Sequence, residues 1–434
     1  GNSEPWSTNF DLFEAPVDGS SAPKNLTEAN EAWDTNPVFL RNGDLAYLAM
    51  SRPGFEADRF RIMLRDARTG ATREVAPDWD RSAGHLGVSA DGRRLLATAD
   101  DLGQHPLFEI RLNGKPRAIT PPGQTAAYTV VGDSVVFVWS TIGAPPDLYV
   151  QRLSGGTPRP LTRVNEDLLR DRSLGEFEQF TFAGWNGETV YGYVVKPFGF
   201  TEGGRYPVAF IVHGGPQSSF ANQWNWRWNA QAFAGAGFGV VFIDFHGSPG
   251  YGQAFTDSIS LDWGGKPLED LQKGLAAALE KYPWLDGERA CALGASYGGF
   301  MINWIAGQWP ERFRCLVNHA GVFDQRSMYY STEELWFPEW DFGGPYFGKP
   351  ENYEKFNPAN FVSRWSTPML VSHGALDFRV PYTQGIGTFT ALQRRGIESR
   401  LLFFPDENHW VLKPANSNLW YQTVIDWLKA HLGQ

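Results

Sequence analysis

The stretch that decides the fold reads Ala290-Cys291-Ala292-Leu293-Gly294-Ala295-Ser296-Tyr297-Gly298-Gly299. Its first four residues form an apolar run typical of a buried strand. Residues 299–309 carry apolar side chains at helical spacing, namely Phe300, Met301, Trp304 and Ile305. A serine flanked by glycines therefore stands on a strand-to-helix connection, and glycine suits a turn too tight for side chains beside the serine.

Strand, Gly-x-Ser-x-Gly and helix, in this order, predict the nucleophile elbow of an α/β-hydrolase with a mostly parallel, doubly wound sheet. The five letters alone are weak evidence, because a chain with 47 glycines can match them in an ordinary glycine-rich turn. The assignment of Ser296 as a nucleophile therefore depends on a base and an acid further along the chain.

Both partners follow in the required order. Asp377 comes shortly after the apolar run 368–372, and His409 follows the apolar run 401–404. Side chains just beyond the carboxyl ends of parallel strands meet at one edge of the sheet. A serine hydroxyl becomes nucleophilic when a neutral imidazole takes its proton, and a carboxylate orients that imidazole. We therefore expect Ser296, Asp377 and His409 to form a catalytic triad.

Each partner alone also fits a plainer role, His409 as a hydrogen-bonded loop histidine and Asp377 as a solvated acid. Asp406, Glu407 and His409 could be read as metal ligands, but their spacing fits no standard zinc site. Together with the elbow, the residues favour the catalytic interpretation, with no metal and no cofactor.

The donors for an oxyanion are expected from an earlier segment. The apolar run 208–212 leads into His213-Gly214-Gly215-Pro216, where glycines let backbone N–H groups approach a substrate. A tetrahedral intermediate needs two such donors, one of them from the residue after the nucleophile. The sequence therefore predicts an oxyanion hole from Tyr297 and either Gly214 or Gly215, although a plain glycine-rich turn would also explain the loop.

The front of the chain follows a different pattern. Four segments repeat a strand, a turn containing glycine, and a short strand, ending at Thr27, Val75, Thr120 and Thr162, which are 48, 45 and 42 residues apart. Asn-Gly and Asp-Gly pairs between these segments are hairpin signals. A four-stranded propeller blade takes about 40–50 residues, so the period predicts a β-propeller.

The repeats amount to about three and a half blades, fewer than the roughly four to eight blades of a closed propeller. We expect an incomplete propeller over residues 1–170, with its N-terminal part missing, and an α/β-hydrolase domain over residues 171–434. Open strand edges invite pairing, so we expect either a separate N-terminal propeller fragment or a second copy of the chain as a partner.

Composition narrows the function classes. The net charge of −10, without a basic stripe, argues against nucleic-acid binding. No run of 18 apolar residues is present, so no membrane span is expected. Cys291 and Cys315 fall on strands expected to be neighbours; a disulfide is conceivable, but we expect buried reduced thiols.

A propeller followed by this hydrolase domain resembles the prolyl oligopeptidase family of serine peptidases over essentially the whole chain. Within it, the chain looks most like the dipeptidyl-peptidase 5 and acylaminoacyl-peptidase branch. One departure is Asp244-Phe245-His246, where that branch usually has Asn-Tyr-Arg. The residues that carry the resemblance are His213-Gly214-Gly215-Pro216, the stretch 244–252, the elbow 294–299, Asp377-Phe378-Arg379-Val380-Pro381 and His409.

The resemblance implies oligopeptide substrates and a periplasmic or secreted location. It also implies that Arg379 holds a substrate backbone carbonyl, next to Val380. The expected substrate pocket is apolar, although the same aromatic side chains could equally form the core of an inserted segment: Tyr329, Tyr330, Trp336 and Phe337. Acidic residues would hold the free amine of a dipeptide, and the local candidates are Glu333, Glu334, Glu339 and Asp341.

Three functions remain open at this point. The first is a serine peptidase that works through an acyl-enzyme and releases N-terminal dipeptides. The second is an acylaminoacyl-peptidase or an esterase that uses the same triad. The third is a catalytically inactive propeller that only binds; the presence of the serine, the acid, the histidine and the oxyanion glycines argues against it.

Overall fold

The computed structural model describes residues 4–433, which fall into two compact units. The first unit comprises Gly1–Arg170 together with Ala221–Trp224 and Pro249–Thr256. The second comprises Asp171–Phe220, Asn225–Ser248 and Asp257–Gln434. Two short segments of the later chain thus belong to the first unit.

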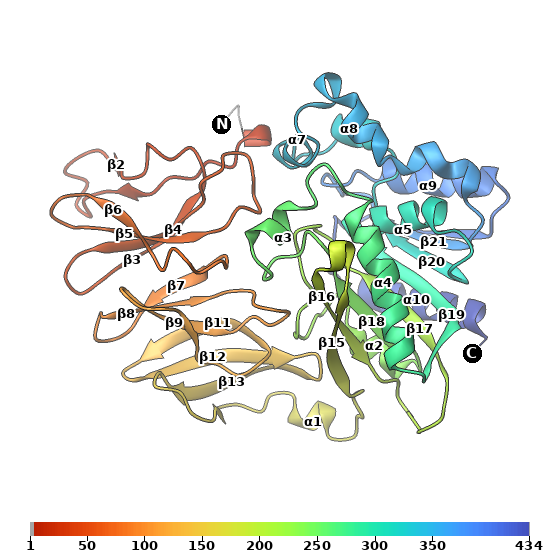
Figure 1. Ribbon diagram of the computed structural model, residues 1–434, viewed down its shortest axis with the longest axis horizontal. Helices are drawn as coiled ribbons and strands as arrows, with labels where there is room; N and C mark the ends of the chain where they lie inside the picture. Colours follow the sequence, from red (N-terminus) through yellow and green to blue (C-terminus); the bar gives the residue numbers. More distant parts are fainter. Residues whose placement is uncertain (1–3, 434) are drawn as a thin grey trace. The chain divides into compact units, whose positions relative to one another are not determined.

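The first unit consists of antiparallel sheets in which strands follow one another in chain order (Figure 1). Three of the sheets have four strands each, which is the pattern of propeller blades. A further two-stranded sheet comes from β1 (Phe13–Glu14) and β2 (Lys24–Asn25). The blades are β3 (Asp34–Phe39), β4 (Leu45–Ala49), β5 (Arg61–Arg65) and β6 (Thr72–Val75); β7 (Gly84–Val88), β8 (Arg94–Thr98), β9 (Leu107–Arg111) and β10 (Arg117–Ala118); and β11 (Gln124–Val131), β12 (Ser134–Thr141), β13 (Ala144–Arg152) and β14 (Arg159–Pro160).

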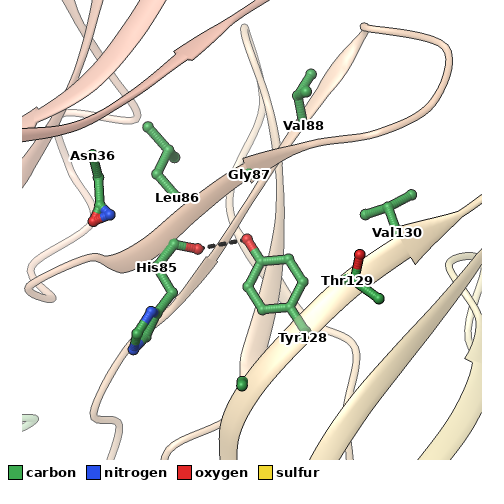
Figure 2. Close-up of a pocket in the computed structure, with 9 residues that line it drawn as sticks. Asn36, His85, Leu86, Gly87, Val88, Tyr128, Thr129 and Val130 are labelled. Carbon is green, nitrogen blue, oxygen red and sulfur yellow. Dashed lines mark hydrogen bonds between the residues drawn. The ribbon is translucent and has the colours of Figure 1, made fainter.

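The first strands of neighbouring blades contact one another, β3 with β7 and β7 with β11. Each of these strands contains a register shift, and Asn36 and His85 take positive φ angles of 51° and 47° there. A hollow of about 440 Å³ is lined by residues of these three strands. Figure 2 shows the Tyr128 hydroxyl directed at the His85 carbonyl oxygen, 2.5 Å away. Tyr128 thereby provides a hydrogen-bond donor for a carbonyl oxygen at the register shift of β7.

The second unit is built on an eight-stranded sheet in the order β15-β16-β18-β17-β19-β20-β21-β22. Strand β16 is antiparallel to both of its neighbours, β15 and β18, and the six strands from β18 to β22 in this order run parallel to one another. All residues of β17, β18, β20 and β21 except the first of β17 are buried, as expected for parallel strands covered on both faces. The strands are β15 (Phe177–Ala183), β16 (Thr189–Val195), β17 (Tyr206–Val212), β18 (Gly239–Asp244), β19 (Leu285–Ala295), β20 (Cys315–His319), β21 (Met369–Gly374) and β22 (Ser399–Phe404).

Helices flank this sheet (Figure 1). Helix α5, which begins directly after the elbow, is buried from Tyr297 to Gly307 and contacts β17, β19 and β20. No helix within residues 4–433 combines the length and the apolar character that crossing a membrane requires. The α-helices of the second unit are α2 (Ala230–Gly235), α4 (Lys266–Lys281), α5 (Tyr297–Gln308), α6 (Gln325–Tyr329), α7 (Trp336–Asp341), α8 (Pro350–Lys355), α9 (Thr383–Arg394) and α10 (Pro414–Leu432). Helix α1 (Glu166–Leu169) and most of α3 (Gln253–Asp257) belong to the first unit.

The fold class predicted from the sequence, an α/β-hydrolase preceded by an incomplete propeller, is confirmed. The prediction of reduced thiols is wrong, because Cys291 and Cys315 form a disulfide. The two cysteines are direct partners in the register of β19 and β20, with Cα atoms 4.8 Å apart, which is within the span of a disulfide. The sequence placed the cysteines on neighbouring strands but could not set the register between them.

Candidate active site

Ser296 lies on the sharp turn between β19 and α5. Its backbone angles, φ 58° and ψ −120°, fall outside the regions that L-residues ordinarily adopt. The glycines around it are required by space: a Cβ on Gly294 would lie 2.6 Å from the carbonyl carbon of Gly298, and one on Gly298 would overlap the Val212 carbonyl oxygen. The elbow therefore holds the serine in a strained conformation beside the end of β17.

Asp377 and His409 are in direct contact. The Nδ1 atom of His409 lies 2.7 Å from Oδ2 of Asp377, and both residues are buried. Oδ1 of Asp377 accepts hydrogen bonds from the backbone N–H groups of Arg379 and Val380, at 3.1 and 2.9 Å. Burial alone would raise the pKa of Asp377, but hydrogen bonds from His373 and His409 outweigh it and hold this pKa well below its usual range. The carboxylate is therefore ionised at neutral pH.

His319, the last residue of β20, connects the serine turn to this pair. Its carbonyl oxygen accepts a hydrogen bond from the backbone N–H of Ser296 at 3.0 Å, and its ring lies 2.7 Å from the Ser372 hydroxyl. Burial, together with the neighbouring rings of His373 and His409, lowers the pKa of His319 to about 3. The carboxyl ends of β19, β20, β21 and β22 thus gather the candidate residues at one edge of the sheet.

The candidate oxyanion donors lie next to Ser296. A Cβ built on Gly214 would lie 3.2 Å from the Ser296 Cβ. Tyr297 is the first residue of α5, so its N–H group has no partner within the helix. Gly215 has a different task, because its φ of 115° and the nearby Gln217 nitrogen, 2.6 Å from a built Cβ, allow only glycine in this turn. Gly214 and Tyr297 are therefore the pair adjacent to the serine.

The loop carrying Gly214 is held in place by the side chain of His213. The His213 ring stacks on Phe245, with centroids 4.0 Å apart, and its Nε2 lies 2.9 Å from the Ser248 hydroxyl. Burial lowers the pKa of His213 to about 4, so the ring is neutral at physiological pH. Phe245 is one of the three residues, 244–246, at which the sequence departs from the expected pattern, and Ser248 lies two residues after them.

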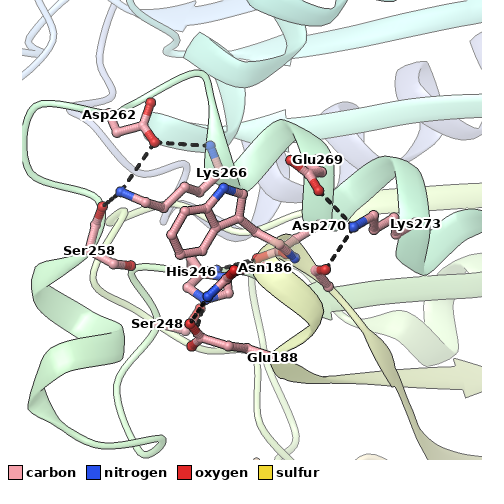
Figure 3. Close-up of polar contacts among 12 residues, drawn as sticks. Asn186, Glu188, His246, Ser248, Ser258, Asp262, Lys266, Glu269, Asp270 and Lys273 are labelled. Carbon is pink, nitrogen blue, oxygen red and sulfur yellow. Dashed lines mark hydrogen bonds and ion pairs between the residues drawn. The ribbon is translucent and has the colours of Figure 1, made fainter.

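His246, in the same segment, is held between two carboxylates (Figure 3). Its Nδ1 lies 2.6 Å from Asp270 of α4, and its Nε2 lies 3.2 Å from Glu188. Burial would lower the pKa of His246, but the hydrogen bonds and charges of Asp270 and Glu188 outweigh burial and raise it. The edge of the His246 ring packs on Trp185, over which Lys266 lies at 5.0 Å. His246 thus lies between two carboxylates at the position where the resemblance led us to expect an arginine.

Arg379 lies beside the acid of the candidate triad and forms an ion pair with Glu334. The guanidinium also lies over the ring of Trp410, 5.3 Å from its centroid, and Trp410 follows His409 directly in the chain. Thr332 donates a hydrogen bond to the Arg379 carbonyl oxygen at 2.8 Å. The segment before α7 is therefore fastened to the loop that carries Asp377.

The other expected substrate-binding residues divide into two groups. Tyr330 is 62 % exposed and available to a ligand, whereas Tyr329 is buried with its hydroxyl donating to Glu339 at 2.9 Å. Phe337 packs against Trp263, which in turn packs against Tyr297; Trp336 is half-buried at the start of α7. Val380 is buried, and its backbone rather than its side chain serves the site.

Three of the four acids proposed for amine binding are distinguished by their contacts. Glu339 accepts a hydrogen bond from Tyr329, and Asp341 is buried and accepts one from the Trp263 indole at 2.7 Å. Glu333 is exposed, with its backbone N–H bound to Phe378. Glu334 alone among the four is paired with Arg379 at the candidate site.

Sequence reasoning missed the supporting residues His319, His373 and Glu407. Glu407 is buried, and its carboxylate accepts hydrogen bonds from the backbone N–H groups of Leu412 and Lys413, at 3.1 and 3.0 Å, and from the Asn416 side chain. It therefore closes the loop that carries His409. The only sequence signal for these residues was a polar side chain at the end of an apolar strand run, or, for Glu407, two residues before the histidine.

Comparison with known proteins shows what this chain is similar to. Residues 224–434 match the prolyl oligopeptidase family. Dipeptidyl-peptidase 5 of Schizosaccharomyces pombe is 40 % identical over 416 residues, covering 93 % of this chain and 60 % of the relative. Dipeptidyl-peptidase 5 of Aspergillus fumigatus is 36 % identical over 430 residues, covering 96 % and 59 %.

The chain spans about three fifths of the length of these relatives. Among solved structures, the Pyrococcus horikoshii acylaminoacyl peptidase superposes with a TM-score of 0.85 at 21 % identity, covering 97 % of this chain and 66 % of that one. That likeness shows the fold alone. Residues 224–434, the part of the chain that is similar to the prolyl oligopeptidase family, contain the elbow and the Asp377–His409 pair.

Proposed function

We propose that the chain is a serine peptidase that cleaves short peptides through an acyl-enzyme and releases N-terminal dipeptides. The observation that carries the proposal is the buried Asp377 carboxylate bound to Nδ1 of His409, which leaves Nε2 to serve the strained serine of the elbow. A neutral imidazole in this orientation is what a serine nucleophile needs.

In the proposed reaction, Oγ of Ser296 attacks the peptide carbonyl carbon while Nε2 of His409 takes the hydroxyl proton. The oxyanion that forms accepts hydrogen bonds from the N–H groups of Tyr297 and Gly214, which are fixed in advance by α5 and the glycine loop. His409 then gives its proton to the departing amine, and an acyl-enzyme remains. A water activated by the same imidazole hydrolyses the ester, and Asp377 stabilises the imidazolium in both halves.

The Glu334–Arg379 pair supports dipeptide release. A carboxylate and a guanidinium lie side by side next to the triad acid, so Glu334 could bind a substrate ammonium while Arg379 binds a backbone carbonyl. The name of the relatives, dipeptidyl-peptidase 5, favours the same reading. The fold likeness to an acylaminoacyl peptidase keeps acyl-blocked substrates as the second candidate.

A matched set of substrates tests the proposal: a dipeptidyl nitroanilide with a free amine, the same compound with an acetylated amine, and a short ester. We expect the free-amine compound to be preferred and Glu334→Gln to remove that preference without changing ester hydrolysis. Preference for the acetylated compound would support the acylaminoacyl-peptidase instead. The variant Ser296→Ala serves as the blank for all three.

We also propose that the propeller unit is completed by a partner, either a bound propeller fragment or a second copy of the chain. The two-stranded β1–β2 sheet and the neighbouring exposed Phe13 and Val17 leave apolar surface and strand edges at one end of the blade series. Light scattering and intact-mass analysis should find either a companion fragment or a dimer at micromolar concentration. A single monomeric 48.5 kDa species would contradict this.

A further inference from the structure

A second buried histidine, His373, faces the Asp377 carboxylate. It lies near the end of β21, and its Nε2 is 2.7 Å from the Val380 carbonyl oxygen and 3.3 Å from Oδ2 of Asp377. A carbonyl oxygen only accepts, so Nε2 carries a hydrogen and donates it. The same Oδ2 receives the hydrogen bond of His409. Two imidazoles are thus directed at one carboxylate oxygen.

The other ring nitrogen of His373, Nδ1, indicates which nitrogen of the ring carries the proton. Nδ1 is buried and has no hydrogen-bond partner among residues 4–433. A proton on Nδ1 would be an unsatisfied donor in a dry site, so the ring keeps its proton on Nε2. The ring fits because residue 385 is glycine: a Cβ there would lie 2.5 Å from Nδ1. Its single donor can therefore be directed only at Val380 and Asp377.

We propose that His373 is a positioning residue of the triad, whose Nε2–H group clamps the turn from Asp377 to Val380 and aims the carboxylate at His409. This role rests on the proposed function, because it needs His409 to act as the base. The clamp joins both ends of one turn: Val380 donates its N–H to Oδ1 of Asp377 and accepts from His373 through its carbonyl. Rotation of the carboxylate away from His409 would break the hydrogen bonds that Oδ1 accepts from the backbone N–H groups of Arg379 and Val380.

The charges around the pair set the sign of the expected effect. Three histidines face Asp377: His373 from the end of β21, His409 from the loop after β22, and His319 from the end of β20. His319 stays neutral, because burial lowers its pKa to about 3. Hydrogen bonds from His373 and His409 keep the pKa of Asp377 low in spite of burial. Without the His373 donor, the Asp377–His409 pair binds its proton more tightly, and the acid limb of activity moves to higher pH.

Three variants test the clamp. His373→Met keeps the bulk and removes the donor, whereas His373→Gln returns an amide N–H at a similar reach. His431→Met is the matched control, because His431 lies on α10 and binds the Trp427 carbonyl within its own helix. Activity against pH is measured per active site, counted with a fluorophosphonate probe, so that misfolded protein does not enter.

We expect His373→Met to lose about 10- to 100-fold in plateau kcat and to move the acid limb up by roughly half to one pH unit. His373→Gln should keep the limb of the unchanged enzyme, as should His431→Met. A slower His373→Met enzyme with an unmoved limb would mean a purely structural role and overturn the proposal, as would a glutamine variant that behaves like methionine.

A second readout does not depend on turnover. The low-field NMR signal of the proton between His409 and Asp377 should titrate at higher pH in His373→Met than in the unchanged protein. If the unchanged protein cleaves no peptide and Ser296 takes no label, the proposed function fails, while this titration still decides the clamp. An identical titration in both proteins would overturn it.

Discussion

Ser296 owes its position to residues that take no part in chemistry. Its φ of 58° is held by the backbone N–H bond to His319 and by the glycines on both sides of the turn. A non-glycine residue in such a conformation costs roughly 1–3 kcal/mol, which the packing of α5 must offset.

Replacing Ser296 by alanine should abolish peptide hydrolysis, by a factor on the order of 10⁵–10⁶, because the triad acts as a unit. The fold should persist, since alanine keeps the Cβ and removes only the hydroxyl. A fluorophosphonate probe should label Ser296 in the unchanged protein and nothing in the variant. Labelling of another residue, or an active alanine variant, would contradict the assignment.

Replacing Arg379 by lysine should slow peptide hydrolysis more than ester hydrolysis. Lysine keeps the positive charge opposite Glu334 but loses the planar fork that can hold a peptide carbonyl and the stacking over Trp410. The ratio of kcat/KM for a peptide and a short ester measures the effect. Equal losses on both substrates would assign Arg379 to structure alone.

Among the elements, the segment 244–248 connects the loop with Gly214, the proposed oxyanion loop, to the body of the second unit. Phe245 and Ser248 hold His213, while His246 ties the segment to Asp270 on α4 and to Glu188 before β16. The loop with Gly214 is therefore linked, through the segment 244–248, to a histidine that contacts two carboxylates. The stability that this link contributes should therefore change with pH in a predictable direction.

The pKa of His246 is higher in the folded protein than in the unfolded chain. The pairing of His246 with Asp270 and Glu188 therefore stabilises the fold fully below about pH 6.5. This contribution to the free energy of unfolding is lost as the pH rises through the folded pKa. His246→Gln should therefore lower the unfolding temperature of the second unit more at pH 6 than at pH 9. At pH 6 the cost should be about 3 kcal/mol, the order expected when a buried pair loses one partner. A matched His431→Gln variant should show little change, and a gap that is the same at both pH values would refute the role of charge.

At the level of elements, the sequence predicted what depends on local pattern. The elbow, the parallel strands and the blade period follow from apolar runs and glycine positions, which are local properties. The contacts between Arg379 and Glu334, and the register that joins Cys291 to Cys315, depend on how distant segments pack, and no local pattern specifies them. The role of His373 was not predicted either, because it depends on the three-dimensional shape of the turn from Asp377 to Val380.

In the whole molecule, each unit carries buried titratable groups, and lowering the pH should change the stability of the two units in opposite directions. The second unit holds His213 and His319, whose pKa values burial lowers to about 4 and about 3. The first unit holds Asp34, whose pKa burial raises to about 6 against hydrogen bonds from Asn30 and Thr27. A pKa that is lower in the folded state means that the unfolded chain binds the proton more strongly, and a raised pKa means the opposite.

Lowering the pH from 6.5 to 4.5 should therefore weaken the second unit and strengthen the first. The unfolded chain protonates its histidines near pH 6.5 while the folded unit does not, which costs up to about 1.4 kcal/mol per pH unit for each. Below pH 6 folded Asp34 binds a proton that the unfolded chain does not, which stabilises the first unit. Hydrogen exchange, corrected for intrinsic rates, should show β17 and β20 losing protection while β3 and β4 gain it; parallel changes in both units would contradict this.

The bond between Cys291 and Cys315 has a practical consequence for peptide mapping. Trypsin cleaves after Arg289, Arg312, Arg314 and Arg326, so Ser296 lies in the fragment 290–312 and Cys315 in the fragment 315–326. In a digest prepared without a reductant, the serine fragment should be absent at its own mass and present as a conjugate of the two. Any search for a covalently labelled serine in this protein should therefore begin by reducing and alkylating the digest.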